Sequence, residues 1–348
     1  MDPDPPDRPE KEFVIGVVPA IGSDRSAAAP IVAGGIFARA GAQTCRGPDE
    51  RVSSGVASRE GAGVIALLIA NSLALASLLI MLASGLALIY GLRDVINFGH
   101  GAIYMLGAYL GYTVALVGGF WLALVVVPIL LAILGIAFEY LALRPLQSRS
   151  HIEVALVTLG LGIILGQIII FFYGGVARSV DAPQVLSGSV TVGSLSYPVY
   201  RIFLIVMGLG SCALLALWLR FTSSGLYVRA VSQDPSVARM MGINADRLSL
   251  LVTSLSTAFA GVAGVLAGPY LSIDPGMDVT MIVNCLIIVV IGGTGSIGGA
   301  IVAALLFGLV QVAGSVFLPN IAALVPYILL MVVLLIAPRG IGHGRVLN

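Results

Sequence analysis

The sequence predicts an all-α protein that crosses a lipid bilayer many times. Hydrophobic residues make up 58% of the 348 residues and charged residues only 10%, whereas soluble domains carry about 25% charged residues. The apolar residues also gather in runs that reach about 20 residues, the helix length that a hydrocarbon core requires. We therefore expect a polytopic helix bundle with eight or nine transmembrane helices.

The first 60 residues form a separate polar region. They hold 16 of the 35 charged residues and the only lysine, Lys11. Their apolar stretch 13–21 is too short to span a bilayer, and acidic rather than basic residues precede it, which disfavours a secretory signal. We expect a disordered N-terminal extension over residues 1–60 and a transmembrane domain over residues 61–348.

Apolar runs follow one another through the transmembrane domain. The weakest is 97–117, because it begins in a polar, glycine-containing segment. It forms either a ninth span or a re-entrant segment, which leaves the side of the N-terminus open. The expected runs are 64–91, 97–117, 120–143, 152–173, 201–220, 248–268, 279–295, 299–318 and 321–338.

Arginines in the connecting segments orient the bundle, because cytoplasmic loops are enriched in them. They gather in residues 144–149, in residues 220–247 and in the tail after residue 338. Spans that alternate from residue 120 onward bring these three regions to one side. This arrangement predicts a cytoplasmic C-terminus and places residues 179–200 outside.

A break in the helical pattern is expected at residues 97–101, where polar residues and glycines interrupt an apolar run. At membrane depth, non-helical backbone has to line a cavity or be buried in protein, and transporters commonly place the solute pathway at such breaks. An ordinary interhelical hydrogen bond is the alternative role for each polar side chain alone. The pathway candidates are Asn97, His100, Tyr104, Asn284 and Gln311.

The chain offers no catalytic set, metal-ligand cluster or nucleotide site of its own. A phosphate-binding loop needs a lysine, and none follows Lys11. Glu139 and Glu153 can pair with Arg144 or Arg149 between them, which is weak support for an ion relay. The net charge of +1 favours no nucleic-acid partner. We expect no cofactor, and we expect another chain to supply any energy that the protein needs.

A short helix is expected within the polar segment 221–247. Ser232 or Asp234 can cap its first turn, where Pro235 is favourable, and Gly242 can end it in a left-handed conformation. A helix of one or two turns is not stable alone. It either packs under its own bundle or, the favoured interpretation, docks on a cytoplasmic partner through exposed Val237, Met240 and Met241 beside Arg239.

Six motifs in order cover residues 64–342. They are G-L-A-L-I-Y-G-L-R-D-V-I-N-F-G-H-G-A-I-Y-M-L-G-A-Y at Gly85, R-P-L-Q-S at Arg144, R-A-V-S-Q-D-P-S-V-A-R-M-M-G-I-N at Arg229, G-V-A-G-V-L-A-G-P-Y at Gly261, I-G-G-T-G-S-I-G-G-A at Ile291 and A-P-R-G at Ala337. Together they resemble the LivH-type permease subunit of branched-chain amino acid ABC importers. The same family includes permeases for urea and short-chain amides.

The resemblance implies the rest of an assembly. It implies an ABC type II-like importer permease in the cell inner membrane, beside a second homologous permease subunit, two cytoplasmic ATP-binding subunits and an extracytoplasmic solute-binding protein. Residues 229–244 match the ATPase-coupling loop of the family. The coupling role is thereby carried to Arg229, Asp234, Ala238, Gly242 and Asn244.

These observations predict a permease subunit for branched-chain or similar small amino acids, without ATPase activity. A permease for urea or short-chain amides remains an alternative. A stand-alone channel or facilitator is another, and it would need no partner. A membrane-embedded enzyme is disfavoured because residues 279–338 contain no charged residue. In importers of the kind that the resemblance implies, the binding protein, which is a different chain, largely sets the identity of the solute.

Overall fold

The structure is a computed structural model that describes residues 50–147, 149–192, 195–293, 295–338 and 340–342. The expected extension therefore lies, through residue 49, outside the described residues. The described chain is all-α apart from one hairpin, as the sequence predicts. Its helices are α1 (Glu50–Arg93), α2 (His100–Phe138), α3 (His151–Tyr173), α4 (Val199–Phe221), α5 (Ser223–Gln233), α6 (Pro235–Met240), α7 (Ala245–Ala267), α8 (Met277–Gly292), α9 (Ile297–Phe317) and α10 (Val325–Ile336).

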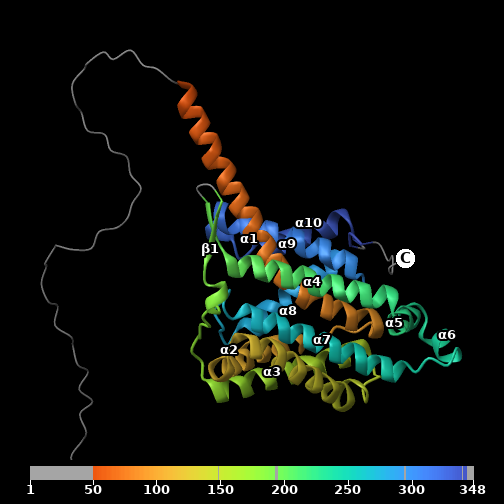
Figure 1. The fold of residues 1–348 in the computed structure, drawn as a ribbon. Coiled ribbons are helices and arrows are strands. Elements are labelled where there is room, and N and C mark those ends of the chain that lie inside the picture. The colour runs from red at the N-terminus through yellow and green to blue at the C-terminus, as the bar shows by residue number, and fades with distance from the viewer. Residues whose placement is uncertain (1–49, 148, 193–194, 294, 339, 343–348) are drawn as a thin grey trace, which may run out of the picture. The chain divides into compact units, whose positions relative to one another are not determined.

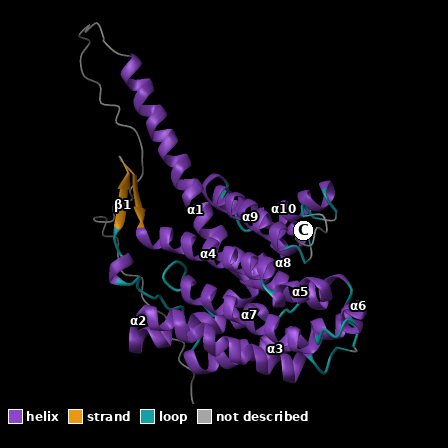
Figure 2. Cartoon of the chain, turned by 45° about the vertical axis from the view of Figure 1, so that its right-hand side comes forward, coloured by secondary structure: helices purple, strands orange, loops and turns teal. Residues whose placement is uncertain are grey.

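Six helices of the described chain are long and apolar enough to cross a membrane. They are α1, α2 with its π-helical extension Glu139–Leu143, α3, α4, α7 and α9; α8 and α10 are shorter apolar helices. In both views α9 and α10 lie on one side of the bundle and α2 and α3 on the other, with α4, α7 and α8 between them (Figures 1 and 2).

Polar connecting segments lie at both ends of α4. Strands β1 (Ser189–Val192) and β2 (Leu195–Pro198) pair antiparallel just before α4 begins. Helices α5 and α6 follow its other end, as Figure 1 shows. A helix of 23 residues is about 34 Å long. The two groups of connections are therefore separated by about the thickness of a bilayer core.

Helix α2 folds back on itself at Gly119, where φ is +82° and ψ is +168°. A β-carbon built on Gly99 would lie 3.7 Å from the Phe138 ring, so the start and end of α2 are neighbours. Midway along the arms, one built on Gly107 would lie 3.2 Å from Leu131. The expected runs 97–117 and 120–143 are thus the two antiparallel arms of this helix.

The break before α2 is displaced from its expected position. Non-helical backbone covers residues 94–99, and both His100 and Gly101 are helical. Asp94 takes a positive φ of 55°, which short polar residues tolerate best. A β-carbon on Gly101 would lie 2.3 Å from the Asp278 carbonyl oxygen. Gly101 therefore serves close packing of α2 on α8, and not the chain break.

Candidate coupling element and polar core

Asp234 caps the short helix α6. Its Oδ1 accepts hydrogen bonds from the backbone N–H groups of Ser236 at 2.9 Å and Val237 at 3.0 Å, and Pro235 is the first helical residue. The Ser236 hydroxyl, followed by these two amides, lowers the pKa of the Asp234 carboxyl from its usual value. The Ser232 hydroxyl instead donates to the Arg229 carbonyl, so Asp234 is the cap of the two candidates.

The other end of α6 is closed by Gly242, whose φ of +82° is left-handed as expected. Its N–H donates to the Arg239 carbonyl at 3.0 Å, and Ile243 N–H donates to the Ala238 carbonyl at 3.1 Å. Asn244 then caps α7 by accepting from the Arg247 N–H at 3.1 Å. Both connections of α6 are thus set by local hydrogen bonds.

Helix α6 has one buried side chain and an exposed apolar surface. Ala238 is 3% exposed and packs in a cluster with Val228, Val231 and Leu248 of α5 and α7. Val237 is 48% exposed, and Met240 and Met241 are 78% exposed. Apolar side chains gathered on the exposed surface of a polar segment are typical of a site that contacts another protein.

Arg229 does not share the exposed surface of α6. It is half-buried on α5 and lines a small cavity with Gly91 at the end of α1 and with Gly295 and Ser296 in the turn before α9. Of the five residues that match the coupling loop, four shape α6 and its two ends. Arg229 instead shares a cavity with the end of α1 and the turn before α9.

The pathway candidates nearest the chain break are fully buried. Asn97 is 1% exposed, and His100 and Tyr104 are 0% exposed. His100 Nε2 lies 3.2 Å from the Leu82 carbonyl oxygen, and Asn97 Oδ1 accepts from Gly99 N–H at 3.0 Å. Within the described chain, Asn97 Nδ2, His100 Nδ1 and Tyr104 Oη have no hydrogen-bond partner. Such groups call for water, a solute or another conformation.

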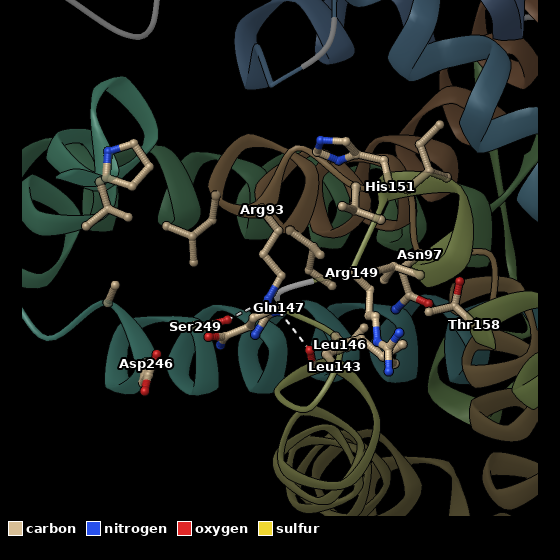
Figure 3. A pocket seen from close by; sticks show the side chains of 18 of the residues that line it. Arg93, Asn97, Leu143, Leu146, Gln147, Arg149, His151, Thr158, Asp246 and Ser249 are labelled. Atoms are coloured by element: carbon tan, nitrogen blue, oxygen red, sulfur yellow. Dashed lines mark hydrogen bonds between the residues drawn. The ribbon is translucent and has the colours of Figure 1, made fainter. Parts of the chain in front are cut away.

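A cavity of about 270 Å³ opens beside Asn97. Figure 3 shows polar side chains from α1, α3 and α7 around it, including Arg93, Thr158, Asp246 and Ser249. Asn284 and Gln311, half-buried on α8 and α9, do not line it. The structure therefore groups Asn97 with residues that the sequence did not single out, and the other four candidates, His100 and Tyr104 included, do not line this cavity.

A buried ion pair next to this cavity corrects one expectation. Glu139, 1% exposed, pairs with Arg93 and not with Arg144 or Arg149. Its carboxylate also accepts hydrogen bonds from Ser249 Oγ and Thr253 Oγ1, both at 2.8 Å. The opposite charge is 46 residues away in the chain, so only tertiary packing brings the two together. The one signal in the sequence was a carboxylate inside the apolar run 120–143 and an arginine just beyond the run 64–91.

Two further ion pairs of the described chain lie at the surface, and the sequence predicted only the first of them. Glu153 pairs with Arg149 at 3.9 Å, as the sequence predicts, and Arg144 pairs with Asp246 at 3.3 Å. All four side chains are more than 40% exposed. The buried acidic group is therefore Glu139, and its partners fix the ends of α1 and α2 to the start of α7.

Comparison with known proteins assigns the family. The chain is 30% identical over 289 residues to the high-affinity branched-chain amino acid transport system permease protein LivH of Salmonella typhimurium, covering 78% of this chain and 93% of that one. It is 28% identical over 295 residues to BraD of Pseudomonas aeruginosa, with the same coverages. A probable LivH of Methanocaldococcus jannaschii is also 28% identical, over 79% of this chain and 91% of its own.

The family described as branched-chain amino acid transport system / permease component matches residues 68–336. The match includes every helix from α2 to α10, the capped helix α6 and the buried polar residues of α2. Because the match spans well over half of the chain, the protein belongs to this family of transport permease components.

Proposed function

We propose that this chain is the transmembrane permease subunit of an inner-membrane importer for branched-chain or similar small amino acids. ATP hydrolysed by cytoplasmic partner subunits would drive it, since the chain itself is proposed to carry no ATPase site. The proposed assembly also holds a second, homologous permease subunit and an extracytoplasmic solute-binding protein. The names of the relatives support the solute class.

The observation that carries this proposal is the construction of α6. Both ends are capped, Ala238 holds its inner face, and Met240 and Met241 stay 78% exposed. A short helix of this kind can transmit a movement only if a partner protein binds its exposed face. We therefore assign α6, with Asp234, Ala238, Gly242 and Asn244, as the coupling element that a partner ATPase moves.

The proposed solute pathway passes the break at residues 94–99. Asn97, His100 and Tyr104 are buried beside it, each with a polar atom that has no hydrogen-bond partner among the described residues, and Asn284 is proposed as a fourth group. Switching between outward-open and inward-open states would bring a solute or water to these atoms. Such a switch is a shift between two conformations that the partners favour differently.

The proposed orientation puts α5, α6 and the C-terminus in the cytoplasm and the β1–β2 hairpin outside. The arginine distribution supports it, because Arg220, Arg229, Arg239 and Arg247 all lie in or beside α5 and α6. The length of α4 supports the separation of the two ends. Cysteine labelling of Met240→Cys and Val185→Cys from each side of intact membranes checks this orientation.

Reconstitution tests the function directly. The chain is placed in proteoliposomes with and without its second permease, ATPases and binding protein, and uptake of radiolabelled leucine is measured. We expect uptake against a gradient only with the complete set and ATP. Uphill leucine uptake by this chain alone, or ATP-driven uptake of urea but not leucine, would overturn the proposal in favour of a carrier or an amide permease.

A further inference from the structure

Two adjacent hollows lie where α4 ends and α7 begins. The larger, about 790 Å³, is lined almost entirely by apolar side chains of α2, α4 and α7, among them Leu214, Trp218 and Phe259. The smaller, about 380 Å³, has a mixed lining from α5, α7 and the end of α6, in which Ser224, Tyr227, Asn244 and Arg247 are the polar residues. Both are lined by Arg247 and Leu251, so the two hollows adjoin at these residues.

Arg247 is the one charged residue among those that line the two hollows. Its backbone N–H caps α7 through Asn244, whereas its guanidinium makes no ion pair with any acidic residue of the described chain. The neighbouring carboxylate, Asp246, is turned to Arg144 at 3.3 Å. The shared boundary of the hollows thus carries an uncompensated positive charge.

The position of the hollows along the bundle matches the edge of a bilayer. Trp218 lies one turn before the end of α4, and tryptophans concentrate at the membrane interface. Ser224 and Tyr227 of α5 line the smaller hollow just beyond that level. Figure 1 shows α5 and α6 at this end of the bundle. The larger, apolar hollow thus lies at acyl-chain depth and the smaller one at headgroup depth.

We propose that the two hollows bind one anionic phospholipid. An acyl chain fills the larger hollow between α4 and α7, and the phosphate lies against Arg247, whose guanidinium suits two phosphate oxygens at once. The Tyr227 hydroxyl lines the smaller hollow and can donate a further hydrogen bond to the headgroup, whereas the Ser224 hydroxyl is already paired with Thr222 Oγ1 at 3.1 Å. Basic pockets between transmembrane helices on the cytoplasmic side are suited to such lipids.

The chemistry favours a lipid over other occupants. A free anion would leave the larger, apolar hollow open. An apolar partner helix would cover it but would leave Arg247 buried without a counter-charge, which is costly. A phospholipid satisfies both hollows with one molecule. Its headgroup would also contact Met241 and Gly242, which line the smaller hollow. The charge of the membrane surface would therefore affect how α6 packs against the bundle.

Native mass spectrometry of the purified full chain tests the site, with phosphatidylglycerol and phosphatidylcholine as probes. We expect the wild type to bind one phosphatidylglycerol about fivefold more tightly than phosphatidylcholine, the preference that one basic residue near the surface provides. Arg247→Gln removes the preference. The matched control is Arg220→Gln: Arg220 lies at the same end of the bundle over the Phe221 ring, lines neither hollow, and its loss keeps the preference.

A second variant tests the apolar part without changing charge. Leu251→Trp fills the junction of the hollows and is expected to weaken binding of both lipids at this site. Equal binding of the two lipids by the wild type, or equal losses in the Arg220 and Arg247 variants, would overturn the proposal. So would protection of Leu251→Cys from a maleimide only in the assembled transporter, since a partner subunit would then cover the hollows. These readouts do not depend on transport.

Discussion

At the scale of single residues, the buried carboxylate of Glu139 shows how a charge is kept inside an apolar bundle. A lone carboxylate away from water would be very unfavourable. Here the Arg93 guanidinium, the Ser249 hydroxyl and the Thr253 hydroxyl all donate to it. Arg93 in turn donates through Nε to Ser249 at 2.8 Å and through Nη1 to the Leu143 carbonyl at 3.2 Å. Each group is satisfied only while α1, α2 and α7 stay together.

Two glutamates of this chain allow the stability contribution of a buried ion pair to be compared with that of an exposed one. Glu139→Gln leaves Arg93 without its counter-charge, and we expect the free energy of unfolding to fall by about 3 kcal/mol. Glu153→Gln breaks a pair whose side chains are 65% and 52% exposed, and it should change stability by less than about 1 kcal/mol. Unfolding of both variants in detergent checks this, and equal effects would contradict the assignment of Glu139.

The cap of α6 predicts a dependence on pH. Hydrogen bonds lower the pKa of Asp234 below its usual value, so its contribution is complete above that usual value and is lost as the pH falls through the lowered one. Hydrogen exchange at the start of α6, corrected for the intrinsic rate, should therefore accelerate on acidification. Asp234→Asn keeps an acceptor but does not titrate. The acceleration should vanish in that variant, and its persistence would show that another group is responsible.

At the scale of elements, α6 depends on its neighbours for its existence. A helix of six residues has too few internal hydrogen bonds to be stable by itself. Ala238 fits because a methyl group fills the space against Val228 and Leu248, and Gly242 fits because its left-handed backbone disfavours other residues. Changes at these two positions should therefore detach α6 and leave the spanning helices in place.

Ala238→Glu forces a carboxylate into that contact, and Gly242→Pro is incompatible with a positive φ. We expect each to reduce ATP-dependent leucine uptake by the assembled transporter at least tenfold, while the chain still inserts and purifies. Uptake in proteoliposomes is the measurement. If either variant transported at the wild-type rate, α6 would not be the coupling element.

A surface variant distinguishes docking from folding. Met240→Ser with Met241→Ser changes side chains that are 78% exposed, so stability should move by less than about 0.5 kcal/mol. Uptake should still fall tenfold or more if these residues lie at the centre of an interface. Val185→Ser, 79% exposed at the other end of the bundle, is the control and should leave ATPase coupling unchanged.

At the scale of the whole molecule, close backbone approach holds the bundle together. In lipid there is little hydrophobic drive between helices, so small residues at the contacts matter most. A β-carbon on Gly264 would lie 2.5 Å from the Tyr104 carbonyl oxygen, and one on Gly208 would lie 2.5 Å from the Ser77 carbonyl oxygen. These contacts join α7 to α2 and α4 to α1 without room for a methyl group.

Two glycines of α4 provide a matched test of this packing. Gly208→Ala must push α4 away from α1, and we expect a loss of about 1–3 kcal/mol. Among the described residues, nothing lies within 4 Å of a β-carbon built on Gly210, so Gly210→Ala should be neutral or stabilise by up to about 1 kcal/mol through helix propensity. Thermal unfolding of both variants is the check. A similar loss in both would mean that helix packing is not the cause.

Local chemistry accounts for what the sequence by itself determined. The apolar runs predicted the helices, because a bilayer core tolerates few other structures. Asp234, Pro235 and Gly242 predicted both ends of α6, because capping involves residues only a few positions apart. The family motifs extended this to the whole chain from residue 64 to residue 342.

Only the tertiary structure decided the features that depend on distant residues. It turned two expected runs into the arms of α2, moved the chain break to residues 94–99, and paired Glu139 with Arg93. It also opened the cavity beside Asn97 and the hollows at Arg247. Composition and periodicity show whether a segment requires an apolar environment, a hydrogen-bond partner or a counter-charge. Which distant group meets that need is settled by packing, because many residues in a bundle of similar apolar helices could have met it.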